Sequence, residues 1–289
     1  MTVGIYGRVF KPEHQSYLEH LVNELEKHKI DAVFYSKYQQ QIPKKYKSYW
    51  AFNGYKDIGS LDLLIALGGD GTILDTIQFI RNKNIPVAGI NMGRLGFLAD
   101  IHKEEIKQLV QSIVENSYTT EERTLLSVVT DQNIFGELNF GLNEFTIHKR
   151  DSASMIVIHV YLNGAFLNSY WADGLIVATP TGSTAYSLSC GGPILFPSVN
   201  TFVITPVAPH NLNARPLIIP DNNILSFEVE GRANSFLCSI DSRFQTLTSN
   251  MQIAVKKADF SFKLIRLPEN SYLKTLREKL RWGEDSRNS

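Results

Sequence analysis

The sequence of 289 residues has few cysteines, no excess of either charge and no long apolar run, and each absence excludes a class of protein. The two cysteines, Cys190 and Cys238, form neither a disulfide framework nor a metal site by spacing. The chain has 29 basic and 29 acidic side chains. It therefore has no net positive charge that would attract nucleic acid or an anionic membrane. No uninterrupted apolar run approaches the roughly 20 residues of a membrane span. The first residues, MTVGIYG, are typical of a strand and turn and not of a signal peptide. We therefore expect a cytoplasmic protein that binds neither nucleic acid nor membrane.

The chain does contain enough apolar residues for a core. Hydrophobic residues make up 43% and charged residues 20%, which predicts a folded chain. In the first half, short apolar runs alternate with segments of helical period, which is typical of a parallel, doubly wound, Rossmann-like α/β domain over residues 1–120. Ligands of such sheets bind beyond the carboxyl ends of the strands. The expected strands are Val3–Tyr6, Asp31–Ser36, Leu63–Leu67 and Ile85–Ile90, and the expected helices begin at Pro12, after Gly71 and at Lys103.

Residues 37–60 interrupt this alternation. They are rich in Lys, Gln and Tyr and carry Pro43, Gly54 and Gly59. This composition predicts a loop or a short irregular segment that could act as a mobile flap.

The pattern changes near residues 118–122, where strands follow one another without helices. This predicts an antiparallel β-sandwich domain over residues 121–268. Asn163-Gly164 indicates a tight hairpin. A final helix, Tyr272–Trp282, is expected to pack back on the first domain within residues 269–289, followed by a flexible tail. The expected strands are Leu125–Thr130, Phe135–Phe140, Asn143–His148, Met155–Leu162, Ala165–Trp171, Leu175–Ala178, Thr201–Thr205, Ile224–Val229, Phe236–Ile240, Ile253–Lys257 and Phe260–Leu267.

The first stretch that suggests chemistry is Gly68-Gly-Asp-Gly71, where an apolar strand turns into a helix. Glycine lets another group approach the main chain closely, and the helix N-terminus beyond it suits phosphate. Asp70 could then act on a group bound beside that phosphate. The four residues fit equally well an ordinary tight turn in which Asp70 caps the helix.

Two further stretches carry polar groups where packing alone does not require them. Glu144, after Asn143, is polar in a strand pattern that otherwise looks half buried, although an exposed edge residue would explain it. Thr181, Ser183 and Thr184 supply three hydroxyls beside a glycine at an expected helix start, whereas an ordinary capped turn needs one.

Two loops complete the set of candidate stretches. Ser189-Cys-Gly-Gly-Pro193 is a turn that lets another chain or a ligand come close. His210 shares a proline-bounded loop with Arg215, which suggests a fixed geometry, although a lone loop histidine is most often plain polar surface.

In order and spacing, these stretches resemble the NAD kinase family over about the whole chain, apart from residues 37–60 and the tail. The Gly-Gly-Asp-Gly motif alone is also similar to diacylglycerol kinases, sphingosine kinases and phosphofructokinases. The long motif Thr179–Tyr186 together with Asn143-Glu144 is specific to the NAD kinase family. The matching stretches are Gly68–Gly71, Asn143-Glu144, Asp173-Gly174, Thr179–Tyr186, Gly191–Pro193, Pro209-His210 and Arg215-Pro216.

The resemblance implies transfer of the γ-phosphate of ATP to the 2′-hydroxyl of the adenosine ribose of NAD, giving NADP. Asp70 would be the general base. Asp173 and His210 would reach a neighbouring subunit's site, so the resemblance implies a homodimer or homotetramer with sites near the subunit interface. Gly68, Gly69, Gly71 and Thr72 would bind the phosphate donor. The implied NAD-binding residues are Gly71, Phe97, Asn143, Glu144, Asp173, Thr181, Ser183, Thr184, Ala185, Tyr186, Ser189 and His210.

The motifs that are missing limit how the substrates can be held. The sequence has no Walker-type lysine loop, so the donor is held in some other way, and no Gly-x-Gly-x-x-Gly fingerprint. NAD would be a substrate bound between the domains. No carboxylate cluster chelates a metal, so Mg²⁺ or another divalent cation would be carried mainly by the phosphates.

Two features leave questions open. Asp241-Ser242-Arg243 stands where many relatives have Asp-Gly, and residues 170–172 do not decide between NAD and NADH. A lipid or sphingoid-base kinase of the same two-domain plan is the alternative enzyme. An NAD(P)-sensing binding protein is the non-enzymatic alternative, although such a sensor would not need the base Asp70.

Overall fold

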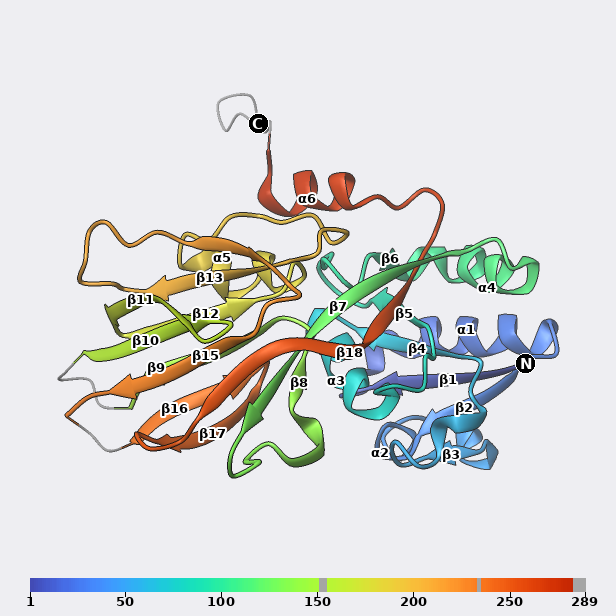
Figure 1. Ribbon diagram of the computed structural model, residues 1–289. Helices are drawn as coiled ribbons and strands as arrows, with labels where there is room; N and C mark the ends of the chain where they lie inside the picture. Colours follow the sequence, from blue (N-terminus) through green and yellow to red (C-terminus); the bar gives the residue numbers. More distant parts are fainter. Residues whose placement is uncertain (151–154, 233–234, 283–289) are drawn as a thin grey trace. The chain divides into compact units, whose positions relative to one another are not determined.

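The computed structural model describes residues 1–150, 155–232 and 235–282, and the chain divides into two compact units (Figure 1). Unit 1 comprises residues 1–122 and the chain from Phe262 onward, and unit 2 comprises Arg123–Ser261. Two long strands, β7 (Thr119–Thr130) and β18 (Ile253–Arg266), contribute residues to both units. No helix in the described ranges is both long and apolar enough to cross a membrane. The tail predicted to be flexible lies outside the described residues from 283 onward.

Unit 1 is a parallel sheet with helices on both faces. The strand order is β5-β4-β1-β2-β3, with Leu264 of β18 pairing beside β5. The buried strand β4 reads LLIALG, as expected for a parallel strand covered on both sides. The elements are β1 (Thr2–Gly7), α1 (Gln15–Lys27), β2 (Asp31–Tyr35), α2 (Ser36–Gln39), β3 (Ala51–Phe52), β4 (Leu63–Gly68), α3 (Asp70–Ile80), β5 (Val87–Asn91), β6 (Ile101–His102), α4 (Ile106–Glu115) and α6 (Tyr272–Leu280).

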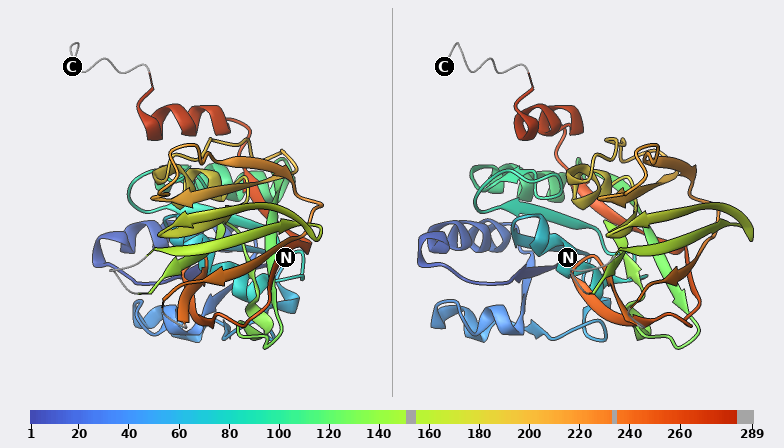
Figure 2. Two further views of the ribbon diagram at one scale, coloured as in Figure 1. Left: turned by 60° about the vertical axis from the view of Figure 1, so that its left-hand side comes forward. Right: turned by 90° about the vertical axis from the view of Figure 1, so that its left-hand side faces the viewer.

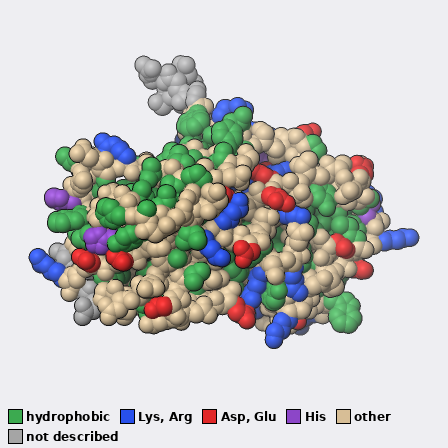
Figure 3. All heavy atoms as spheres, in the orientation of Figure 1, with side chains coloured by type: hydrophobic (Ala, Val, Ile, Leu, Met, Phe, Trp, Pro, Cys, Tyr) green, Lys and Arg blue, Asp and Glu red, His purple; other side chains and the backbone are tan. Residues whose placement is uncertain are grey.

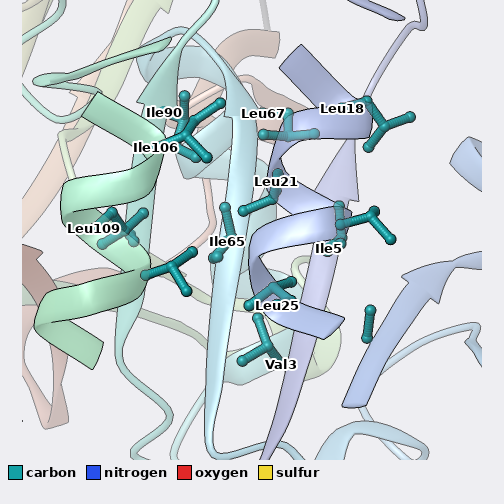
Figure 4. Close-up of a cluster of buried hydrophobic side chains, with 14 of the residues drawn as sticks. Val3, Ile5, Leu18, Leu21, Leu25, Ile65, Leu67, Ile90, Ile106 and Leu109 are labelled. Carbon is teal, nitrogen blue, oxygen red and sulfur yellow. The ribbon is translucent and has the colours of Figure 1, made fainter. Parts of the chain in front are cut away.

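The helices divide between the two faces of this sheet. Helices α1 and α4 lie side by side on one face (Figures 1 and 2). Their apolar positions, such as Leu21 and Leu109, pack on Ile5 and Ile65 of the strands (Figure 4). Helix α3 covers the other face, where a Cβ on Gly89 would lie 2.2 Å from Cδ1 of Ile73. The predicted doubly wound α/β fold is therefore confirmed.

Residues 37–60 form the short irregular segment that is one of the two structures predicted from their composition, and they are not an open loop. They form α2, two short 3₁₀ turns and β3, and they bury Tyr38, Ile42, Tyr46 and Phe52. Tyr46 and Phe34, for example, pack with ring centroids 5.8 Å apart. Their burial was not predicted, because Lys and Gln between these apolar residues mask their spacing in the sequence.

Unit 2 is an antiparallel sandwich, as predicted. One sheet is six-stranded, in the order β14-β13-β12-β9-β16-β17, and the other runs β11-β10-β15-β18. Apolar side chains from both sheets form one core, including Phe145 of β9 and Phe227 of β15. The elements are β8 (Phe140–Gly141), β9 (Glu144–Lys149), β10 (Ile156–Leu162), β11 (Ala165–Ala172), β12 (Gly174–Ala178), α5 (Tyr186–Ser189), β13 (Thr201–Val207), β14 (Leu217–Pro220), β15 (Leu225–Glu230), β16 (Ser235–Ile240) and β17 (Arg243–Thr248).

The strand predictions in unit 2 hold with four corrections, the first being that β7 begins at Thr119 and not at Leu125. The predicted strand Phe135–Phe140 is mostly a 3₁₀ turn, because Asn133 and Gly136 take positive φ values of 47° and 57°. The two strands predicted after residue 252 are one, β18, since polar residues inside it do not break the ladder. Strands β14 and β17 were not predicted, and β14 ends in a proline at a sheet edge, where a missing N–H costs little.

The hairpin at Asn163-Gly164 is confirmed. The two residues take φ values of 50° and 82° between β10 and β11, as a tight turn of this kind requires.

Candidate active site

The Gly68–Gly71 turn follows β4 directly and leads into α3. Gly69 is the N-cap residue of α3, and Asp70 is its first residue. A Cβ on Gly68 would lie 2.1 Å from Oγ1 of Thr72, so a larger residue does not fit where the strand turns into the helix. The turn therefore lies at the positive end of the helix dipole, which suits a phosphate group.

The Asp70 side chain crosses to the loop that follows β5. Its Oδ2 accepts the backbone N–H of Phe97, and its Oδ1 accepts those of Leu98 and Ala99, each at 2.9 Å. A carboxylate has about four lone-pair positions, so one on Oδ2 remains for a further donor. The interpretation of Asp70 as a simple helix cap is wrong, because its carboxylate organises another loop.

Asn91 and Gly96 shape this loop around the carboxylate. Asn91, the last residue of β5, donates from Nδ2 to the carbonyl oxygens of Arg94 and Ala99. A Cβ on Gly96 would lie 1.9 Å from Oδ1 of Asp70. The loop can therefore close on Asp70 only with glycine at position 96.

Phe97 is held by the C-terminal part of unit 1. Arg266 donates from Nη2 to the carbonyl oxygen of Phe97 at 3.2 Å and forms ion pairs with Asp100 and, at 2.9 Å, with Glu121. The Phe97 ring lies 6.3 Å from the ring of Tyr272 in α6. The chain after β18 thus returns to the first domain, as predicted, and fixes a residue beside Asp70.

A cavity of about 290 Å³ opens beside the turn. It lies where β1 and β4 end, and the strand order runs in opposite directions on either side of this point. Ligands of doubly wound sheets bind at such a switch point. Sequence reasoning missed the basic residues there, although Arg8 directly follows β1. The lining includes Gly68, Gly69, Thr72, Arg8, Lys11, His14 and Arg94.

In unit 2, Asp241 shapes the Asn143-Glu144 stretch. Its Oδ1 accepts the N–H groups of Asn143 at 2.8 Å and Glu144 at 3.2 Å, and its Oδ2 accepts that of Leu142 at 3.0 Å. Arg243 lies 3.8 Å from Asp241 and donates to the carbonyl oxygen of Leu138 at 2.6 Å. Asp241 and Arg243, which belong to the segment that departs from the family pattern, therefore help to hold the Asn143-Glu144 stretch.

Glu144 is buried in the middle of a sheet. Strand β9 pairs with β12 on one side and β16 on the other, so the interpretation of Glu144 as an exposed edge residue is wrong. Its side chain is 8% exposed, and Oε2 has no hydrogen-bond partner among the described residues. Burial, together with the neighbouring Asp241, raises the pKa of Glu144 to about 8. Asp241, with three N–H donors and Arg243, is the better placed of the two to carry the negative charge.

The Thr179–Tyr186 motif leaves β12 and packs against Asn143. The N–H of Thr179 donates to the carbonyl oxygen of Asn143 at 2.9 Å. Ser183 is fully buried, and its hydroxyl donates to Pro180 at 2.6 Å and accepts the N–H of Leu195 at 2.9 Å. Thr181 is likewise buried and accepts from Arg123 at 3.2 Å. Two of the three predicted hydroxyls therefore hold the turn, while Thr184 is partly exposed.

Helix α5 brings Tyr186 back toward the other end of β12. The Tyr186 ring lies 5.6 Å from the ring of His148, with an angle of 30° between their planes. His148 pairs in register with Gly174, next to Asp173, and Asp173 forms an ion pair with Lys149 at 2.6 Å. Sequence reasoning missed His148, whose pKa is lowered by burial. The structure thus groups Tyr186 and Asp173, which are distant in sequence.

The loop with His210 is exposed and lies beside β11. The N–H of His210 donates to the carbonyl oxygen of Trp171 at 2.8 Å. Arg215 turns back on the same loop and donates to the carbonyl oxygen of Ala214 at 2.8 Å. Leu212 is 86% exposed. The loop is ordered by its own hydrogen bonds, in line with the fixed geometry that its two prolines suggest.

The turn Ser189–Pro193 was predicted to allow close approach of another group, and the group that comes close is a side chain of the same unit. Gly191 has a φ of 81°, and a Cβ on Gly192 would lie 2.2 Å from Oγ of Ser187. In the described part of the chain, no group of three or more His, Cys, Asp or Glu side chains is arranged to hold a metal ion.

Comparisons with known proteins agree with the two units. A family model of the ATP-NAD kinase N-terminal domain matches residues 3–118, and one of the ATP-NAD kinase C-terminal domain matches residues 142–267. The chain is 48% identical to the NAD kinase of Cytophaga hutchinsonii and 45% identical to that of Flavobacterium johnsoniae, in each case over 100% of both chains.

Solved structures share the fold. Yeast NADH kinase complexed with NADH has a TM-score of 0.86 at 24% identity and covers 100% of this chain and 89% of its own. An NAD kinase from Archaeoglobus fulgidus in complex with ATP has a TM-score of 0.77 at 22% identity, over 97% of this chain and 99% of its own. The relatives favour an NAD kinase over the lipid-kinase alternative. With both domain models and full-length relatives in agreement, the chain belongs to the NAD kinase family.

Proposed function

We propose that this protein is an NAD kinase, which transfers the γ-phosphate of ATP to the 2′-hydroxyl of the adenosine ribose of NAD and forms NADP. The observation that carries the proposal is the agreement of both domain models and the full-length relatives with that name. The geometry at Asp70 adds a physical reason, because an acid stands beside a glycine turn and a helix N-terminus that suit phosphate.

In this proposal Asp70 orients the 2′-hydroxyl and accepts its proton as the new bond to the γ-phosphorus forms and the bond from that phosphorus to ADP, the leaving group, breaks. A ribose hydroxyl is far less acidic than a carboxylic acid, so proton transfer accompanies phosphoryl transfer and contributes roughly 10²–10⁴ in rate. The three backbone N–H donors fix the carboxylate. The remaining lone pair of Oδ2 is the position for the substrate hydroxyl.

The donor phosphates would lie against the backbone of Gly68, Gly69, Gly71 and Thr72. The cavity beside these residues supports this, because its basic lining complements a triphosphate. Most of the remaining rate acceleration would come from aligning the phosphoryl group and stabilising its charge.

The described residues offer no metal-binding cluster. A divalent cation such as Mg²⁺ would therefore enter with the donor, bound chiefly by phosphate oxygens. When bound, it neutralises charge on the transferred group.

In unit 1, the proposed NAD contacts are Gly71 and Phe97. In unit 2, Asn143 and Glu144 would hold the adenosine side. Thr181 and Ser183 form hydrogen bonds within the protein, so they would hold the turn from which neighbouring residues, such as Thr184, contact NAD. The remaining proposed contacts are Asp173, Thr184, Ala185, Tyr186, Ser189 and His210.

A homodimer or homotetramer with sites near the subunit interface is part of the proposal. Hydrophobic side chains gather on the surface over β10–β13 of unit 2 (Figure 3). Among the exposed large residues near His210 are Trp171, at 56%, and Leu212. Light scattering on the purified protein tests the assembly, and a monomer at assay concentrations would contradict it.

A coupled assay for NADP, with ATP and with or without Mg²⁺, tests the function directly. NAD is expected to be the acceptor, and a lipid acceptor under the same conditions provides the comparison. Phosphorylation of the lipid without NADP formation would favour the lipid-kinase alternative. Binding of NAD without turnover would favour the sensor.

A further inference from the structure

Three side chains outside the sequence motifs form a connected group, and one of them, Arg8, lines the 290 Å³ cavity. Arg8 follows β1, and its Nε and Nη2 atoms both donate to Asp75 of α3, the latter at 2.5 Å. The hydroxyl of Tyr6 donates to Oδ2 of the same carboxylate at 3.0 Å. Asp75 thus receives three hydrogen bonds and connects the end of β1 to the second turn of α3.

This group fixes the Arg8 guanidinium over the glycine turn. A Cβ on Gly71 would lie 3.2 Å from Nη1 of Arg8, so the guanidinium lies against the backbone where the donor phosphates are proposed to bind. The bonds from Arg8 to Asp75 use Nε and Nη2, so Nη1 is the third guanidinium nitrogen and lies nearest Gly71. It is therefore the atom best placed to reach a phosphate oxygen.

The pair is not a simple surface ion pair. The Arg8 side chain is 49% exposed, whereas Asp75 is 19% exposed and Tyr6 is buried. Burial and the adjacent Asp75 both raise the pKa of Tyr6, so its hydroxyl stays protonated and can donate. The two partners thus hold one end of a long, otherwise flexible arginine and leave its outer face toward the cavity.

We propose that Arg8 binds the phosphate groups of the ATP donor and that Asp75 and Tyr6 are positioning residues that hold its guanidinium for this contact. The inference rests on the proposed function, since it concerns the donor of the same reaction. A planar guanidinium with two nitrogens already fixed by a carboxylate loses little further freedom when it binds phosphate.

The direction in which one substitution changes ATP affinity distinguishes a positioning role of Asp75 from a purely electrostatic one. Asp75→Asn removes a negative charge beside the cavity. If Asp75 acted only through its charge, a polyanion would bind more tightly to the variant. If Asp75 positions Arg8, ATP binds more weakly, because the free guanidinium must be ordered on binding.

The test is titration calorimetry of the full-length chain with magnesium ATP in the absence of NAD. We expect ATP to bind about tenfold more weakly to Arg8→Gln and about fivefold more weakly to Asp75→Asn. The double variant should bind no more weakly than Arg8→Gln alone, because Asp75 acts through Arg8. The affinity for NAD should stay within about twofold in each variant, whereas a general loss of structure would lower both affinities.

Two further variants keep the test decisive. Tyr6→Phe keeps the ion pair and should weaken ATP binding by about twofold, so it replaces Asp75→Asn if that variant does not fold. Glu19→Gln removes the 2.9 Å ion pair with Lys45 in the same unit, away from the cavity lining, and should leave ATP affinity unchanged.

Unchanged or tighter ATP binding by Asp75→Asn would overturn the inference, as would an equal loss in the Arg8→Gln background. These results are independent of turnover. A wild-type chain that binds ATP but forms no NADP would contradict the proposed function and leave the positioning result standing.

Discussion

The Oδ1 atom of Asp70 accepts the backbone N–H of Leu98 at 2.9 Å, which links the proposed base to a loop 28 residues away in sequence. Phe97 and Ala99 of the same loop also donate their backbone N–H groups to Asp70, so the loop surrounds most of the carboxylate. Among the residues that the structure describes, Asp70 is oriented by these backbone N–H groups and by no ion pair. A change at either end should therefore alter catalysis and loop stability together.

Replacing Asp70 by Asn should abolish most NADP formation and leave NAD binding intact. The amide cannot accept the hydroxyl proton, so we expect a rate loss of roughly 10²–10⁴. One backbone N–H would face the new NH₂ group, which should lower the free energy of unfolding by about 1–3 kcal/mol. The coupled assay, NAD calorimetry and thermal melting measure the three effects.

Asp62→Asn is the matched control for this substitution. Asp62 also accepts a backbone N–H in unit 1, that of Thr2 at 2.6 Å, and it is not among the proposed site residues. The control should retain full activity. Full activity of Asp70→Asn itself would rule out its role as the base.

Gly96→Ala should inactivate the enzyme without touching a reactive group. The new Cβ would lie 1.9 Å from Oδ1 of Asp70, so the carboxylate must shift. A displacement of about 1 Å at a reacting group can cost roughly 10²-fold in rate. Gly54→Ala, whose Cβ would meet nothing within 4 Å, should show wild-type activity and melting temperature. Normal activity of Gly96→Ala would mean that the observed carboxylate position is not the one used in catalysis.

The sequence predicts the elements around this site better than the contacts within it. The apolar strand before Gly68 and the helix after Gly71 were correctly predicted, because their periodicity is local. The partners of Asp70 were not, since Phe97–Ala99 bond it through backbone N–H groups, which every residue type except proline carries. No pattern of side chains could have indicated that contact.

A similar limit explains the other residues that were missed. Arg8 and Asp75 are 67 positions apart, and each looks like an ordinary surface charge until the parallel order of β1 and β4 is known. Glu144 was ambiguous because an alternating strand does not tell whether it lies at an edge or in the centre of a sheet. Asp241 was noted as a departure from the family pattern, but its three bonds to residues 142–144 depend on the pairing of β16 with β9.

Removal of divalent cations should stop NADP formation and leave the protein's stability unchanged. The described residues contain no cluster for a metal ion, so the cation is expected to enter with ATP. A chelator should abolish activity, and added Mg²⁺ should restore it. The melting temperature without nucleotide should be the same with and without the chelator. A lower melting temperature in chelator would instead indicate a metal ion bound by the protein itself.

Glu144→Gln should change how stability depends on pH. In the folded chain burial and Asp241 raise the pKa of Glu144 to about 8, above its ordinary value. Between about pH 4.5 and pH 8, the folded state therefore holds a proton that the unfolded state releases. The free energy of unfolding falls as pH rises through this window, by an amount on the order of a few kcal/mol, and levels off above it.

Glutamine cannot ionise, so the variant lacks this decrease. The stability of Glu144→Gln relative to wild type should rise from pH 5 to about pH 8 and then level off, as measured by denaturant unfolding at each pH. Asp241 remains in both proteins, so its own titration largely cancels in the comparison. Glu104→Gln, at an exposed position of unit 1, should follow the wild-type curve throughout. Parallel curves for Glu144→Gln and wild type would show that Glu144 titrates near its ordinary pKa and that its carboxyl is solvated in the folded protein.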